Sequence, residues 1–118
     1  MTGNGTSEAQ YQKALDLLEN GNLKQAYTEF EKAVQAGHIR AHTALAEALC
    51  YGMGAERDIT RAVELYRIAA ETDCNACFAL YELHGDGVSL ITEQEAANML
   101  EKAAVFGHKK AMAILERK

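Results

Sequence analysis

Two ten-residue stretches of this chain, KAVQAGHIRA at 32–41 and KAAVFGHKKA at 102–111, read almost alike. Aligning the chain with itself shows that each belongs to a longer repeated segment. Three such segments coincide, at 22–38, 58–74 and 92–108, with spacings of 36 and then 34 residues. A period of this size is the signature of a protein built from stacked structural repeats.

Each segment carries a small, a large and a second small apolar residue at positions i, i+4 and i+7. The three sets are Ala26, Phe30 and Ala33; Ala62, Tyr66 and Ala69; and Ala96, Leu100 and Ala103. This spacing places the three residues on one face of an α-helix. The alanines allow a neighbouring helix to approach closely, and the large residue fills the remaining space.

Another helical stretch precedes each segment, at 8–19, 39–51 and about 75–84. One helix pair cannot bury its apolar face alone, so we expect three pairs to stack. The expected fold is all-α: a short right-handed α-solenoid of three antiparallel helix pairs plus a C-terminal capping helix. The repeats are expected at about 8–37, 38–73 and 74–107 and the cap at 108–118, which together form one repeat domain at 8–118.

The first residues, MTGNGTSEAQ, have neither a basic start nor an apolar core, so they do not resemble a secretory signal. We expect a disordered lead-in at 1–7, with Thr6 or Ser7 capping the first helix. No apolar run is long enough to span a bilayer. Three cysteines without a secretion signal indicate a reducing compartment, and a cytoplasmic location is expected.

The Gly-x-Gly turns at 51–58 and 84–92 match one another, and NGNL at 20–23 is a tighter version. Both follow a helix rather than a strand, which argues against a phosphate-binding loop. We interpret the first glycine as a helix C-cap that requires a positive φ, and the second as the residue that turns the chain.

The stretch GHIRAHTALAEALCYGMGAERDITRAVELYRIAAETD at 37–73 resembles a Sel-1-like repeat, a longer-loop relative of the tetratricopeptide repeat. The residues that fit the pattern are Ala41, Leu45, Gly52, Gly54, Asp58, Ala62, Tyr66, Ala69 and Ala70. The resemblance covers about residues 9 to 118, although 9–36 are more similar to a tetratricopeptide repeat. It implies a solenoid that binds proteins in assembly or signalling, with structural roles for the junction histidines His38 and His108.

The third repeat departs from this pattern, as does the second. Ala46 replaces a glycine and Leu49 a tyrosine, and the third repeat is two or three residues short before Gly85. The shortening leaves open which of the three apolar residues of this helix face the core. These residues are Phe78, Leu80 and Tyr81.

The Cys-x-x-Cys motif at Cys74 and Cys77 opens a helix, where the helix dipole lowers a thiol pKa. A zinc site needs four ligands, and the spacing does not demand His84 or His108 as the other two. The favoured interpretation is a small core residue at Cys77, aligned near Ala41 and Ala111. We expect neither a metal nor a cofactor, and a thiol- or metal-dependent regulator is kept as an alternative function.

No enzyme is expected, because the sequence contains no G-x-S-x-G, P-loop or H-E-x-x-H motif. The acidic residues fall mostly on the outer faces of second helices. His42 and His84, on first helices, are expected to have surface rather than catalytic roles. The net charge of −5 argues against nucleic acid, whose recognition needs clustered lysines and arginines.

First helices line the inner face of a curved solenoid, so we predict a concave binding groove there. The predicted contact residues are Tyr11, Arg40, Thr43, Glu47, Tyr51, Tyr81 and His84. Aromatic residues and arginine dominate protein-binding surfaces, which suggests a peptide or a partner helix as the ligand. The predicted function is a non-enzymatic scaffold or adaptor. An immunity-type inhibitor of a toxin is a second alternative, and self-association is also left open.

Overall fold

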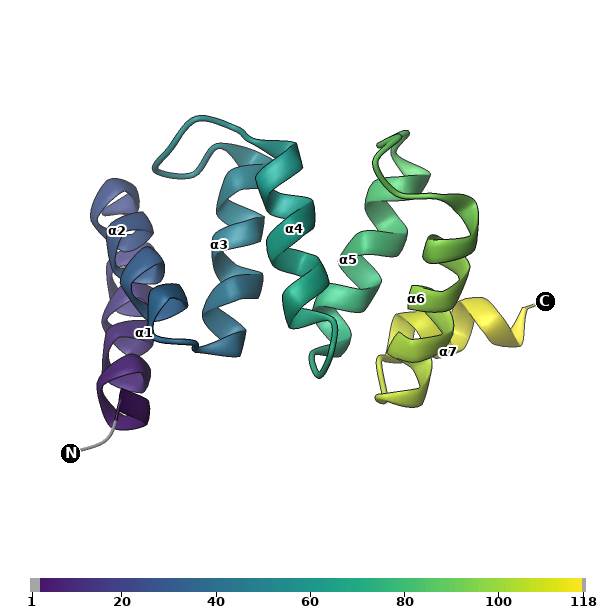
Figure 1. Ribbon diagram of the computed structural model, residues 1–118, viewed down its shortest axis with the longest axis horizontal. Helices are drawn as coiled ribbons and strands as arrows, with labels where there is room; N and C mark the ends of the chain where they lie inside the picture. Colours follow the sequence, from purple (N-terminus) through teal and green to yellow (C-terminus); the bar gives the residue numbers. More distant parts are fainter. Residues whose placement is uncertain (1–2, 118) are drawn as a thin grey trace. The chain divides into compact units, whose positions relative to one another are not determined.

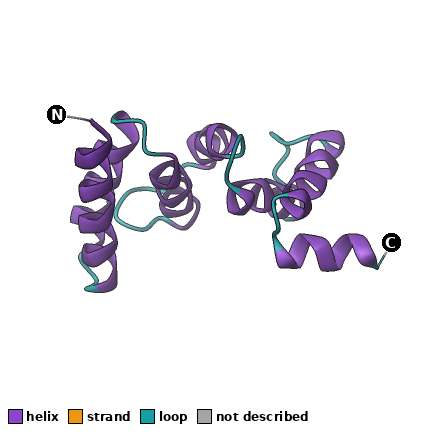
Figure 2. Ribbon diagram, turned by 90° about the horizontal axis from the view of Figure 1, so that it is seen from below, coloured by secondary structure: helices purple, strands orange, loops and turns teal. Residues whose placement is uncertain are grey.

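The computed structural model describes residues 3–117 of the chain. The described part contains seven helices and no strand (Figures 1 and 2). The helices are α1 (Gly3–Glu19), α2 (Leu23–Gln35), α3 (Ile39–Tyr51), α4 (Ile59–Ala69), α5 (Cys74–Gly85), α6 (Glu93–Val105) and α7 (Lys109–Glu116). The predicted all-α class is therefore confirmed. The chain divides within α4 into two compact units, one up to Leu65 and one from Tyr66 onward.

The first unit is organised around the pairing of α1 with α2. These two helices run side by side in opposite directions, and α3 packs on α2 (Figure 1). The predicted small-large-small face of α2 is buried, with Phe30 only 2% exposed between Ala26 and Ala33. Phe30 lies against the ring of Tyr11 from α1, with ring centroids 6.1 Å apart. Burial of this face holds the first repeat together.

The start of α1 differs from the prediction. The helix begins at Gly3, so neither Thr6 nor Ser7 is an N-cap, and the predicted cap is wrong. The Ser7 side chain is instead buried inside the unit. Tertiary packing of this kind outweighs the weak helix propensity of Gly3 and Gly5. Residues 1 and 2 of the predicted lead-in lie outside the described residues.

The second unit repeats the arrangement, with α5 and α6 antiparallel and α7 packed on α6 (Figure 1). The α6 face of Ala96, Leu100 and Ala103 is buried as predicted. Phe78 and Leu80 of α5 are buried as well, whereas Tyr81 is half-buried. The structure thereby resolves which of the three apolar residues of α5 face the core.

The two Gly-x-Gly turns are not equivalent in the way the sequence alignment suggested. Gly52 ends α3 in the left-handed region, with φ +68°, as predicted for a C-cap. Gly85 is instead the last residue of α5, and Gly87 carries the positive φ of +96°. Gly52 and Gly87 each lie 14 residues after the N-cap of their helix, His38 or Asp73. The two turns therefore match through Gly52 and Gly87, because α5 continues helically to Gly85.

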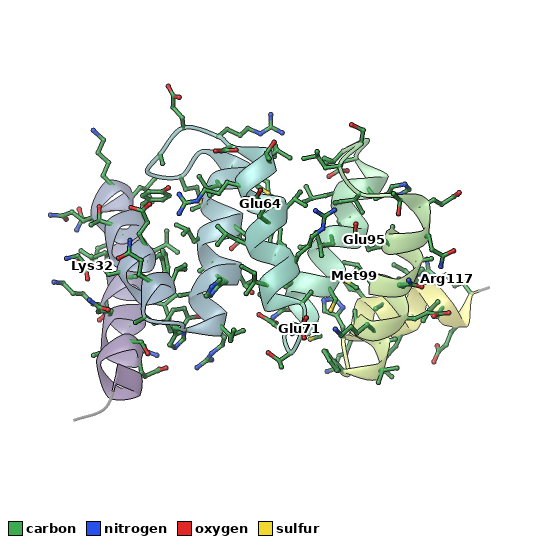
Figure 3. The ribbon with its side chains drawn as sticks, viewed as in Figure 1. Lys32, Glu64, Glu71, Glu95, Met99 and Arg117 are labelled. Carbon is green, nitrogen blue, oxygen red and sulfur yellow. The ribbon has the colours of Figure 1, made fainter. Side chains whose placement is uncertain are left out.

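An arginine ties the loop between α5 and α6 to α4. Arg67 Nε and Nη2 each donate to a carboxylate oxygen of Glu95 at 2.9 Å, and Nη2 also donates to the Leu90 carbonyl at 2.8 Å. The two bonds to Glu95 form the bidentate arrangement that a planar guanidinium favours. They also lower the pKa of Glu95 from its ordinary value. Glu95 is labelled in Figure 3, at the first turn of α6.

Candidate functional site

A histidine begins α3 and links it to α1. His38 is the N-cap of α3, and its Nδ1 accepts a hydrogen bond from the Ala41 backbone N–H at 3.2 Å. Because Nδ1 is the acceptor, the neutral ring carries its proton on Nε2. Nε2 then donates to Glu8 Oε1 of α1 at 2.7 Å. This hydrogen bond lowers the pKa of the Glu8 carboxyl from its ordinary value.

Two of the predicted contact residues, Tyr11 and Arg40, meet beside this histidine. The Tyr11 ring stacks on His38 with centroids 4.5 Å apart and planes 23° apart. The Arg40 guanidinium lies on the Tyr11 ring, 5.3 Å from its centroid, and Nη2 is 4.0 Å from Glu8 Oε1. A guanidinium held by a cation–π contact loses less freedom when it binds a partner.

The remaining predicted residues of α3 form a stripe along one face of the helix. Arg40, Thr43, Glu47 and Tyr51 follow one another at intervals of three or four residues, which brings them to the same side. Arg40, Glu47 and Tyr51 are exposed and Thr43 is half-buried. Tyr51 is 72% exposed, which is unusual for so large an aromatic side chain. We call these four residues the α3 stripe.

The second unit contains a related junction at the start of α7. His108 is the N-cap of α7, and its Nδ1 accepts from the Ala111 N–H at 3.3 Å. Its ring stacks on Phe78, with centroids 4.3 Å apart and planes 19° apart. Phe78 in turn lies 5.6 Å from the ring of Tyr81, a predicted contact residue, and His84 is half-buried one turn further along α5.

Comparison with known proteins follows from these repeated junctions. No protein-family model matches the sequence. Human protein sel-1 homolog 2 is 35% identical over 75 residues, which are 63% of this chain and 11% of the human protein. The crystal structure of a Sel1 repeat protein from Oxalobacter formigenes matches with a TM-score of 0.77 and 26% identity, over 89% of this chain and 45% of that one. The chain is built of Sel1-like repeats. It spans less than two thirds of either relative.

The junction histidines of these Sel1-like repeats have the structural role that the resemblance implied. Their capping of α3 and α7 was not anticipated, although the repeated Gly-His and the alanine three residues later were its visible signal. Glu8 was also missed, because a lone glutamate near the N-terminus carries no pattern. The surface role predicted for His42 is wrong. His42 is buried, and its Nδ1 donates to the His38 carbonyl at 2.7 Å.

The Cys-x-x-Cys motif lies at the junction between the second and third Sel1-like repeats. Cys77 is buried, as predicted, and its thiol donates to the Ala70 carbonyl at 3.3 Å. Counted from the N-caps, however, Ala76 rather than Cys77 takes the place of Ala41. Burial raises the pKa of the Cys77 thiol, whereas a reactive cysteine needs a lowered one.

We expect thiol reagents to separate the three cysteines. Cys74 is half-buried, whereas Cys50 and Cys77 are buried, so a native chain should show one fast-reacting thiol and two that react at least about tenfold more slowly. Labelling with a chromogenic disulfide and peptide mapping would measure this. Cys74→Ser should remove the fast phase and Cys77→Ser should leave it. Loss of the fast phase in Cys77→Ser would contradict the burial argument.

Two further properties bear on the candidate functions. Within residues 3–117, no three His, Cys, Asp or Glu side chains gather closely enough to hold a metal ion. Neither His84 nor His108 therefore completes such a group with the cysteine pair. In the same part of the chain, no helix combines the length and apolar character needed to cross a membrane.

Proposed function

We propose that this chain is a non-enzymatic protein-interaction module that binds a peptide or partner helix along its first helices. The observation that carries the proposal is the α3 stripe, which begins at an arginine held on Tyr11 and ends at the exposed Tyr51. The similarity to Sel1 repeat proteins supports the same role, since repeats of this kind present extended binding surfaces.

The chemistry of the stripe specifies the partner in outline. Tyr51 offers a large, rigid, amphipathic surface, and aromatic residues and arginine are the commonest hot spots of interfaces. Arg40 would pair with a carboxylate of the partner and Glu47 with a basic group. The two charges lie on one face of the same helix. A partner segment would therefore carry its acid and base in the same order and an apolar or aromatic group opposite Tyr51.

In the second unit, Tyr81 and His84 are proposed as additional contacts of the predicted groove. Both are half-buried on α5, and Tyr81 is supported from below by Phe78. They present less surface than Tyr51, so we assign them a secondary share of the binding energy.

The stripe is tested by the double substitution Glu47→Lys with Tyr51→Ala. Loss of one hot spot typically costs about 2 kcal/mol, so we expect affinity for the cognate partner to fall about 30-fold. Quantitative capture from native lysate would identify the partner, and titration with the purified partner would give the affinity. Both side chains are exposed, so the melting temperature should not change.

A matched control is Glu64→Lys with Ile68→Ala, which makes the same charge change at exposed positions of α4. Glu64 is labelled in Figure 3. The control should bind normally. Equal binding by a folded stripe variant would refute the proposal. Blocked partner activity at saturation would indicate an inhibitor of the toxin-immunity kind, whereas unchanged activity would indicate an adaptor.

A further inference from the structure

The last helix, α7, occupies the position of a first helix in a repeat. It is capped by His108 in the same way that His38 caps α3, and it packs against the preceding second helix, α6. Ala111 makes this contact and is fully buried. Within residues 3–117, no second helix follows α7.

Position-by-position comparison with α5 shows what this leaves open. Counted from the N-caps Asp73 and His108, Met112 corresponds to Cys77 and Leu115 to Leu80. Cys77 and Leu80 are both 0% exposed in α5, which packs against α6. Met112 is 44% exposed and Leu115 is half-buried. The side of α7 that a second helix would cover is therefore open and apolar, and we call it the Met112 face.

Charged residues flank this face at both ends of α7. Lys109 stands in its first turn and Glu116 at its last residue, seven positions apart and therefore on the same side of the helix. Met112 lies between them. A helix packed antiparallel on α7, as α6 packs on α5, would bring its C-terminal half to Lys109 and its N-terminal half to Glu116.

The repeats themselves show which kind of helix covers a first helix. The second helices that pair with α1 and α5 each present alanine, a large apolar residue and alanine at i, i+4 and i+7. We infer that the Met112 face is a docking site for an amphipathic helix of a partner protein with this small-large-small pattern. The helix runs antiparallel to α7, with a basic residue in its first half and an acidic residue in its second.

A second copy of the chain does not provide such a helix. All three small-large-small faces, on α2, α4 and α6, are buried within the chain, with their large residues at most 5% exposed. The first helices lack the pattern. A partner protein is therefore the occupant that matches the chemistry of the face. This site is independent of the α3 stripe, since it uses different residues in the other unit.

The test joins a candidate helix to the full chain, so that weak docking becomes measurable. The α2 sequence, LKQAYTEFEKAVQ, is appended after residue 118 through a flexible Gly/Ser linker of about 12 residues, which gives a local concentration on the order of millimolar. This helix carries the required pattern, with Lys24 in its first half and Glu31 in its second. The readout is oxidation of native Met112 by hydrogen peroxide, followed by peptide mapping, with half-buried Met53 of the first unit as internal reference.

We expect the appended helix to slow Met112 oxidation about tenfold while the Met53 rate is unchanged. The matched control replaces the appended helix's phenylalanine with glutamate and should remove the protection. Glu47→Lys with Tyr51→Ala should leave it intact, so failure of the α3 stripe and failure of this site are distinguishable. Equal Met112 rates with the native and control extensions would overturn the inference. Protection of the unextended chain that grows with its own concentration would identify a second copy as the occupant and would equally overturn it.

Discussion

Replacing Gly54 by alanine is expected to lower the free energy of unfolding by about 3–5 kcal/mol. An added Cβ would lie 2.2 Å from the Leu23 carbonyl oxygen and 2.7 Å from its carbon, which are backbone atoms of α2. Neither atom can move without shifting the start of the helix. The residue also has φ +86°, which costs a non-glycine residue about 1–2 kcal/mol on its own. The clash adds an overpacking cost of about 1–3 kcal/mol.

Gly52→Ala provides the matched control for Gly54. Gly52 also has a positive φ, but its nearest neighbour would be the Ala55 carbonyl oxygen at 3.7 Å, an ordinary contact. We therefore expect a loss of only about 1–2 kcal/mol, from backbone strain alone. Urea denaturation followed by circular dichroism would compare the two variants. Equal losses would show that the close approach of the loop to α2 does not matter.

Replacing Phe30 by alanine should cost about 3–5 kcal/mol of unfolding free energy. Phe30 is the large member of the small-large-small face and is almost fully buried, so its removal leaves a cavity between α1 and α2. The substitution also removes the ring against which Tyr11 packs. Because Tyr11 supports Arg40, binding through the α3 stripe should weaken even where the variant remains folded.

Phe30→Leu tests whether cavity size sets this cost. Leucine keeps most of the apolar volume, so we expect a loss of less than about 2 kcal/mol. Thermal melts and urea titrations of both variants, with Tyr51→Ala as an exposed control, would measure the difference. Tyr51→Ala should change stability by at most about 0.5 kcal/mol. A small loss for Phe30→Ala would mean that the repeat closes around the cavity.

Part of the candidate site could be predicted from the sequence and part could not. The residues of the α3 stripe follow from helical spacing, which is why Arg40, Glu47 and Tyr51 are exposed on α3 as expected. The stacking of Tyr11 on His38 and the hydrogen bond from His38 to Glu8 join residues of different helices, 27 and 30 positions apart. No local pattern encodes that approach.

The open face of α7 shows the same division. The sequence indicated half a repeat there and a helix that caps the third repeat. That α7 packs on α6 through Ala111 yet leaves Met112 exposed depends on which neighbours surround it. Met112 and Cys77 hold equivalent positions in their helices and differ in burial only because α6 covers one of them.

By itself, the sequence determined the helices, their small-large-small faces and the repeat period, because helical periodicity is a local property that single residues write directly. The three buried faces and the bounds of α3 follow it closely. Only the tertiary structure decided that α1 starts at Gly3, that His42 is buried and that Gly87 rather than Gly85 matches Gly52. Those outcomes depend on contacts between helices, where burial outweighs the local preferences of the chain.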